Sequence, residues 1–134
     1  MTKILAVGAM FTLTAVLAWA GPNNNIAPVK IGTADAAKHY DEDLIVTGTV
    51  AQVTVRPTIV FINLDQPFPN SPFTAVIQSQ YTNDFGDVKL LKGKSVEIQG
   101  HVKKFHDKPE IALENTNQLI VVGGSVSTNA PAAK

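Results

Sequence analysis

Two segments of this chain carry residue types suited to binding a chain of nucleotides. The candidate binding residues are Arg56, Phe61, Asn63, Lys94, Lys103, Lys104 and Phe105. An aromatic ring can stack on any nucleobase, and lysine or arginine side chains neutralise phosphates. We therefore expect these residues to form a surface for single-stranded nucleic acid if the fold brings them together.

The charged residues are balanced in number but unevenly distributed. The chain has 11 Lys+Arg and 11 Asp+Glu residues. Between residues 89 and 108, however, six lysines oppose only Glu97 and Asp107, whereas residues 41–43 are all acidic. A basic segment is the electrostatic footprint expected of a polyanion binder. The same lysines would also suit an ordinary solvated strand and turn.

Three phenylalanines each have two interpretations. Phe61 belongs to the apolar run 59–64, so its ring could stack on a base or pack in the core. Phe68 lies between two prolines, and we expect it to fold back and plug one end of the sheet, because isolated exposed phenylalanines are uncommon. Phe105 follows Lys103 and Lys104, a grouping that suits either a single-strand binder or any solvated hairpin.

Residues for catalysis or metal binding are sparse. The chain has no cysteine, and its histidines, at positions 39, 101 and 106, are dispersed. The sequence contains neither a Gly-x-Ser-x-Gly motif nor a glycine-rich phosphate loop. The acidic residues 41–43 lack the spaced oxygen ligands of a calcium loop. We therefore expect a protein that is not an enzyme and that needs no metal or cofactor.

The first residues have the pattern of an export signal. Lys3 precedes an apolar stretch from Ile4 to Leu17, and Ala18-Trp19-Ala20 forms an A-x-A cleavage pattern. The apolar stretch is shorter than the roughly 20 residues that span a bilayer. We expect a cleaved signal peptide at residues 1–20, a periplasmic or secreted location, and no membrane span after cleavage.

Composition divides the remainder into three parts. Residues 21–32 are rich in proline, asparagine and alanine and are expected to form a flexible leader. Residues 33–122 are expected to form one folded domain. Residues 123–134 are small and polar and are expected to form a disordered tail.

Alternating apolar residues and turn signals predict a mainly β domain. The expected strands are residues 44–56, 58–65, 73–78, 95–103 and 109–113, with residues 119–122 closing the sheet or lining its edge. Thr33 is expected to cap a short N-terminal helix, Gly48 to mark a bend or bulge, and residues 81–91 to form a short helix between the third and fourth strands. This order predicts a closed, five-stranded barrel of the OB-fold class.

Six short motifs carry a resemblance to a known family. They are Gly48-Thr49-Val50, Phe61-Ile62-Asn63, Pro69-Asn70, Phe73-Thr74-Ala75-Val76-Ile77, Leu91-Lys92-Gly93-Lys94 and Asp107-Lys108-Pro109-Glu110-Ile111. Together they resemble small exported bacterial OB-fold domains of the nucleic-acid-binding, anticodon-binding-like type. The resemblance implies that Phe61 stacks on a base. Two positions depart from the family pattern, Ala75 where the family has glutamine and Asp107 where glycine is usual.

We therefore expect an exported, non-catalytic OB-fold module that binds single-stranded nucleic acid through its second and third strands and its basic hairpin. The alternative is a periplasmic OB module that binds a small ligand or a protein partner, such as an envelope protein, without binding nucleic acid. A net charge near zero and Ala75 favour this alternative. An accessory domain that works beside a separate nuclease or envelope protein is a third possibility.

Overall fold

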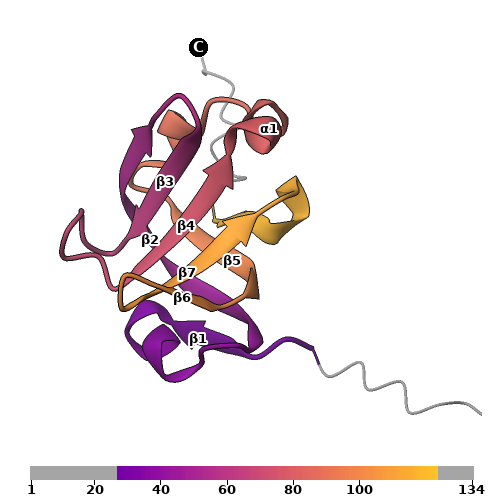
Figure 1. The fold of residues 1–134 in the computed structure, drawn as a ribbon. Helices are drawn as coiled ribbons and strands as arrows, with labels where there is room; N and C mark the ends of the chain where they lie inside the picture. Colours follow the sequence, from indigo (N-terminus) through magenta and orange to yellow (C-terminus); the bar gives the residue numbers. More distant parts are fainter. Residues whose placement is uncertain (1–26, 124–134) are drawn as a thin grey trace, which may run out of the picture.

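The computed structural model describes residues 27–123, which form a mainly β domain (Figure 1). The expected signal peptide, most of the expected leader and residues 124–134 of the expected tail lie outside the described residues. Within residues 27–123, no helix is both long enough and apolar enough to cross a membrane.

Eight strands occur in the described part of the chain. They are β1 (Lys30–Gly32), β2 (Asp43–Val55), β3 (Ile59–Leu64), β4 (Phe73–Gln78), β5 (Ser95–His101), β6 (Lys103–Phe105), β7 (Lys108–Leu113) and β8 (Leu119–Val122). The sheet has the order β6-β7-β4-β3-β2-β5-β8, and β1 pairs with β2. Neighbours are antiparallel except β1 with β2 and β4 with β7, which are parallel.

The five expected strands correspond to β2, β3, β4, β5 and β7, but two details of the expected barrel are wrong. First, β1 and β6 are additional short strands, and β1 occupies residues expected to be flexible leader, whereas the expected segment at 119–122 is present as β8 at the sheet edge, paired with β5. Second, among the described residues no backbone pairing joins the two ends of the sheet, so it is open rather than closed.

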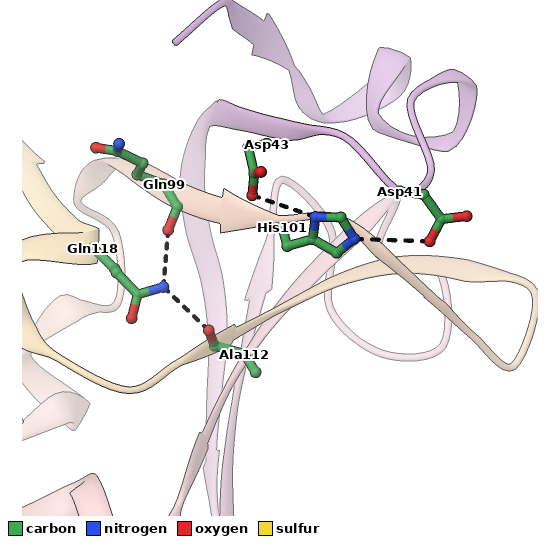
Figure 2. Close-up of polar contacts among 6 residues, drawn as sticks. All are labelled: Asp41, Asp43, Gln99, His101, Ala112 and Gln118. Atoms are coloured by element: carbon green, nitrogen blue, oxygen red, sulfur yellow. Dashed lines mark hydrogen bonds and ion pairs between the residues drawn. The ribbon is translucent and has the colours of Figure 1, made fainter.

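No backbone ladder joins β5 to β7. A side chain bridges these two strands instead. The amide nitrogen of Gln118 donates to the carbonyl oxygens of Gln99 in β5 and Ala112 in β7, at 3.1 and 3.2 Å (Figure 2). A Cβ atom at Gly100 would lie 2.7 Å from Ile111 Cγ2. Glycine at this position therefore makes room for the Ile111 side chain beside β5.

Strand β2 joins the two halves of the sheet. Its residues Asp43–Thr49 pair with β5, and Val50–Val55 pair with β3. The expected irregularity is present, but it lies between Val50 and Gln52 rather than at Gly48. Gly48 has another role, because a Cβ atom there would lie 2.7 Å from Thr33 Cγ2.

The short helical segments are α1 (Ser79–Thr82) and 3-10 turns at Thr33–Lys38, Asn83–Phe85, Val88–Leu91 and Thr116–Gln118. The expected helix at 81–91 is broken by Gly86, whose φ of +63° suits glycine. Thr33 does not cap its helix, because its hydroxyl donates to the Asp65 carboxylate. The first 3-10 turn and β1 lie at one end of the molecule, and α1 lies at the other (Figure 1).

The core lies inside the curved sheet and is built from alternating residues of its strands. On β3, for example, Val60, Ile62 and Leu64 belong to the core, whereas Phe61 between them does not. The largest fully buried side chains are Phe73, Ile62, Leu64, Ile77, Ile98, Ile111 and Leu113. This alternation leaves the opposite, outer face of β2, β3, β4 and β7 free to carry a binding site.

Candidate functional site

An open groove of about 380 Å³ lies on the outer face of the sheet, between the loop that joins β3 to β4 and the hairpin that joins β6 to β7. Its volume is within the range of roughly 300 to 1,000 Å³ that is typical of ligand sites. Its lining includes four of the seven candidate residues, namely Arg56, Phe61, Asn63 and Phe105. The groove is therefore the place where the fold brings most of the predicted site together.

Strand register arranges the outer face of the sheet, at and beside the groove, in two rows. The first row runs across four strands as Gln52, Asn63, Thr74 and Glu110, each paired with the next. The second row runs as Thr54, Phe61, Val76 and Ala112. Side chains of paired residues project from the same face of a sheet. One row is therefore polar and the other is mainly apolar.

Phe61 is half-buried and lines the groove, outside the core. Its partner in β4, Val76, is only 4 % exposed although it too lies outside the core cluster. The outer face therefore carries an apolar patch of its own. Phe61 therefore does not pack in the core, and its ring lies where a ligand could reach it.

Two further phenylalanines border the groove from the loops. Phe68 is 74 % exposed and Phe105 is 52 % exposed. The expectation that Phe68 plugs an end of the sheet is wrong, because its side chain is largely exposed and lines the groove, where its backbone N–H donates to the Gln52 side chain. The ring of Phe105 packs edge-on against the His106 ring, with 4.2 Å between centroids.

A hydrogen-bond network fixes the β3–β4 loop to the floor of the groove. Asn63 is 3 % exposed, and its side-chain oxygen accepts from the hydroxyls of Thr74 at 2.8 Å and Ser71 at 3.3 Å. Its nitrogen donates to Gln52 Oε1, which also accepts from the backbone N–H of Phe68 at 3.0 Å. The side chain of Asn63 therefore positions the loop that carries Phe68, and its polar atoms are largely committed within the protein.

Lys108 holds the same loop from the other side of the groove. Its ammonium group donates to the backbone carbonyl of Pro69, and to that of Ser71 at 3.2 Å. Because backbone carbonyls satisfy hydrogen bonds without neutralising charge, Lys108 keeps its positive charge at the groove. In sequence, Lys108 is one of six lysines in the basic segment, and it is not among the seven candidate residues.

The other basic candidates separate into two groups. Arg56 lines the groove, and Lys103 is the strand partner of groove residue Glu110. Lys104 pairs with Pro109 and lies elsewhere, with its ammonium 3.0 Å from Asp107 and 5.8 Å from the centre of the Tyr40 ring. Lys94 does not line the groove either, since it precedes β5 and its carbonyl accepts from Val50 N–H.

Glu110 is the one acidic residue that lines the groove in the described part of the chain. Burial raises the pKa of its carboxyl above the ordinary value, and the positive charges of His106 and Lys103 only partly oppose this effect. Functional sites commonly contain a carboxyl group whose pKa is shifted by burial in a cleft. In sequence, Glu110 belongs to the motif at residues 107–111, and no local pattern marks it as a binding residue.

His39 and His101 contact the acidic residues 41–43, whereas His106 lies at the groove. His101 lies 3.3 Å from Asp43 and 3.8 Å from Asp41 (Figure 2), and His39 lies 3.0 Å from Glu42. Among residues 27–123, no group of three or more His, Cys, Asp or Glu residues is arranged to hold a metal ion.

Several groove residues were missed because their position depends on strand register. Gln52, Thr54, Thr74 and Glu110 are ordinary strand residues in sequence. Period-two alternation could have placed Gln52 and Thr54 on one side of their strand together with Arg56. Alternation could not have shown that Glu110 lies in one row with Gln52 and Thr74, because that requires the pairing of β4 with β7.

Neither a protein-family model nor a curated protein matches this chain. Several solved structures resemble it, two of them as follows. OBody AM2EP06, solved bound to hen egg-white lysozyme, gives a TM-score of 0.51 at 15% identity over 69% of this chain and 91% of that chain. A protein assigned as an aspartyl-tRNA synthetase from Leishmania major Friedlin gives 0.49 at 14% identity over 72% of this chain. The match covers only 21% of the synthetase chain. The likeness to the OBody is one of fold alone.

Proposed function

We propose that this chain is an OB-fold module that binds single-stranded nucleic acid in the groove on the outer face of β2, β3, β4 and β7. The observation that carries the proposal is the set of three accessible phenylalanine rings, Phe61, Phe68 and Phe105, around one groove that also holds Arg56 and Lys108. Stacked aromatic rings and unneutralised cations are the two components from which single-strand binding sites are built.

The arrangement divides naturally into base contacts and phosphate contacts. The rings offer flat faces to bases, and each such stacking contact contributes roughly 1 to 3 kcal/mol. Arg56 has no acidic partner within 4.0 Å among the described residues, and Lys108 is bonded only to carbonyl oxygens. These two side chains, with Lys103 beside the groove, can therefore attract phosphates along the strand.

The OB-fold assignment rests on strand order. The five longer strands follow the order β7-β4-β3-β2-β5, with helical turns between β4 and β5. OB-folds are five-stranded barrels that are partly open, so the seam between β5 and β7 is compatible with this class. The fold likeness to the OBody adds support.

The export signal pattern at residues 1–20 supports a periplasmic or secreted location. In that location the module acts without catalysis, and an envelope protein is a further candidate partner. Cleavage can be checked by mass spectrometry of the protein recovered from a periplasmic fraction, where a mature chain that begins at Gly21 is expected.

Titration with fluorescently labelled single-stranded DNA and RNA tests the binding proposal. We expect saturable binding whose affinity falls as salt rises, because phosphate contacts release counterions. Double-stranded DNA of the same length should bind more weakly, since its bases are not free to stack on Phe61. Affinity no greater than that of an inert protein of similar charge, or affinity independent of salt, would contradict the proposal.

A second candidate function is the binding of a small ligand or a protein partner. The exposure of Phe68 and Phe105 favours it, because accessible apolar side chains also occur at protein interfaces. Replacement of Arg56 and Lys103 by glutamate separates the two functions. A nucleic-acid binder should then lose affinity, whereas a site for a neutral ligand should keep it.

A further inference from the structure

The carboxylate of Glu110 has no hydrogen-bond or ion-pair partner among residues 27–123, although the side chain is half-buried. Its environment acts on it only through desolvation and through the more distant charges of His106 and Lys103. In this part of the chain, every inaccessible polar side-chain atom does have a partner. The unpartnered oxygens of Glu110 are therefore accessible from the groove.

Partial burial of a carboxylate without a hydrogen-bond donor costs free energy. A ligand that supplies donors would offset this cost. The neighbours of Glu110 restrict the ligand. Arg56, Lys108 and Lys103 are all positive, so a free cation would be repelled from the groove as a whole. A neutral group with two N–H donors, attached to phosphates that these cations attract, fits the site better.

Among the nucleobases, guanine best matches an ionised carboxylate. Its Watson–Crick edge presents two adjacent donors, N1–H and N2–H, which can bond both oxygens of one carboxylate in parallel. Cytosine and adenine offer one donor beside an acceptor, and the N3–H of uracil or thymine lies between two carbonyl oxygens. An ionised carboxylate only accepts hydrogen bonds, so each adjacent acceptor would repel it. Bases in single strands are commonly recognised along this edge.

We propose that Glu110 makes the groove selective for an unpaired guanine, with the guanine ring held among the phenylalanines and its Watson–Crick edge bonded to the Glu110 carboxylate. This inference rests on the proposed function, because it assigns the base preference of the same groove. Glu110 lies at the end of the polar row, next to Thr74. The Thr74 hydroxyl already donates to Asn63, so the Glu110 carboxylate is left free to accept from a ligand.

The test uses oligothymidylate strands of about 12 nucleotides, a length typical of one OB-fold site. One central base is replaced by guanine, hypoxanthine, adenine or cytosine. At neutral pH the guanine strand should bind about fivefold or more tightly than the unsubstituted strand, the lower limit of discrimination by a bidentate contact. Hypoxanthine lacks the 2-amino group, so its strand should lose most of this advantage.

The variant Glu110→Gln should reduce the guanine advantage to less than about twofold, because the amide replaces one acceptor with a donor. Glu114→Gln is the matched control, since Glu114 is exposed and does not line the groove. Circular dichroism and thermal unfolding of both variants establish that they are folded.

Three outcomes would overturn the proposal. Equal, salt-dependent binding of all strands by the wild-type protein would remove base selection and leave single-strand binding intact. A guanine preference that persists in Glu110→Gln would show that another residue selects the base. If no strand binds at all, the proposed function fails, and base selection fails with it.

Discussion

The side-chain nitrogen of Gln118 lies 3.2 Å from the carbonyl oxygen of Ala112 and donates a hydrogen bond to it across the open seam of the sheet. The same nitrogen donates to Gln99 on the other side of the seam (Figure 2). The oxygen of the Gln118 amide accepts from the backbone N–H groups of Glu114 and Asn115 at 2.7 and 3.1 Å. The side-chain nitrogen of Gln118 thus bridges the two strands, while its side-chain oxygen caps the 3-10 turn at Thr116–Gln118.

Gln118→Ala should therefore destabilise the domain. The change leaves carbonyl and N–H groups at the seam without partners, and we expect the free energy of unfolding to fall by about 1 to 3 kcal/mol. Urea denaturation measures the loss, and hydrogen exchange should show faster exchange in β7. Gln99→Ala is the control, because only the backbone of Gln99 takes part in the seam contact and its side chain is exposed. Equal losses in the two variants would contradict this account.

Phe61→Ala should weaken single-strand binding far more than it weakens the fold. Loss of one stacking surface should cost about 1 to 3 kcal/mol of binding free energy. The ring lies outside the core, so stability should fall by no more than about 1 kcal/mol, as for a cross-strand contact. Fluorescence titration and thermal unfolding give the two quantities. Leu90→Ala is a suitable control, because Leu90 is an apolar residue, 68 % exposed, that does not line the groove. An unchanged affinity in Phe61→Ala would exclude stacking on this ring.

Two adjacent lysines should behave differently on replacement. Lys103→Gln should weaken nucleic-acid binding and reduce the slope of log K against log salt by about 0.7, the value for one phosphate contact on a single strand. Lys104→Gln should have little effect, because Lys104 is paired with Asp107 and lies near Tyr40. Titrations at several salt concentrations test both variants. Equal effects of the two would indicate a diffuse charge effect and not a contact at the groove.

Glu110 should make stability depend on pH. Burial raises the pKa of this carboxyl in the folded state, so the folded protein holds the proton more tightly than the unfolded chain. The resulting stabilisation is present below the ordinary value of 4.5 and is lost as pH rises through the raised folded-state pKa. Glu110→Gln removes this titration. At neutral pH the variant should be the more stable protein, by less than about 1 kcal/mol because solvent screens a half-exposed group.

The difference between Glu110→Gln and wild type should shrink as pH falls below that ordinary value, because the wild-type carboxyl is then neutral in both states. Thermal unfolding over this pH range provides the measurement. A variant that is less stable than wild type at neutral pH would show that the carboxylate has a stabilising partner, which would also count against its role as a free acceptor for guanine.

Local patterns were sufficient to predict much of the fold. The five main strands and the helical segment after β4 follow from alternation, glycine positions and turn residues. These are properties of short segments, so they can be recognised without knowing what packs against them. Phe61 and Phe105 could likewise be selected as candidate binding residues, because aromatic residues in strands and hairpins are conspicuous.

The sequence by itself determined a mainly β domain with aromatic and basic residues suited to one surface. Only the tertiary structure decided that Glu110 shares a row with Asn63, that Phe68 is exposed, and that Gln118 bridges an open seam. The physical reason is that these relationships depend on register between strands far apart in the chain. Register is set by the packing of the whole core, and a pattern within any one segment does not contain it.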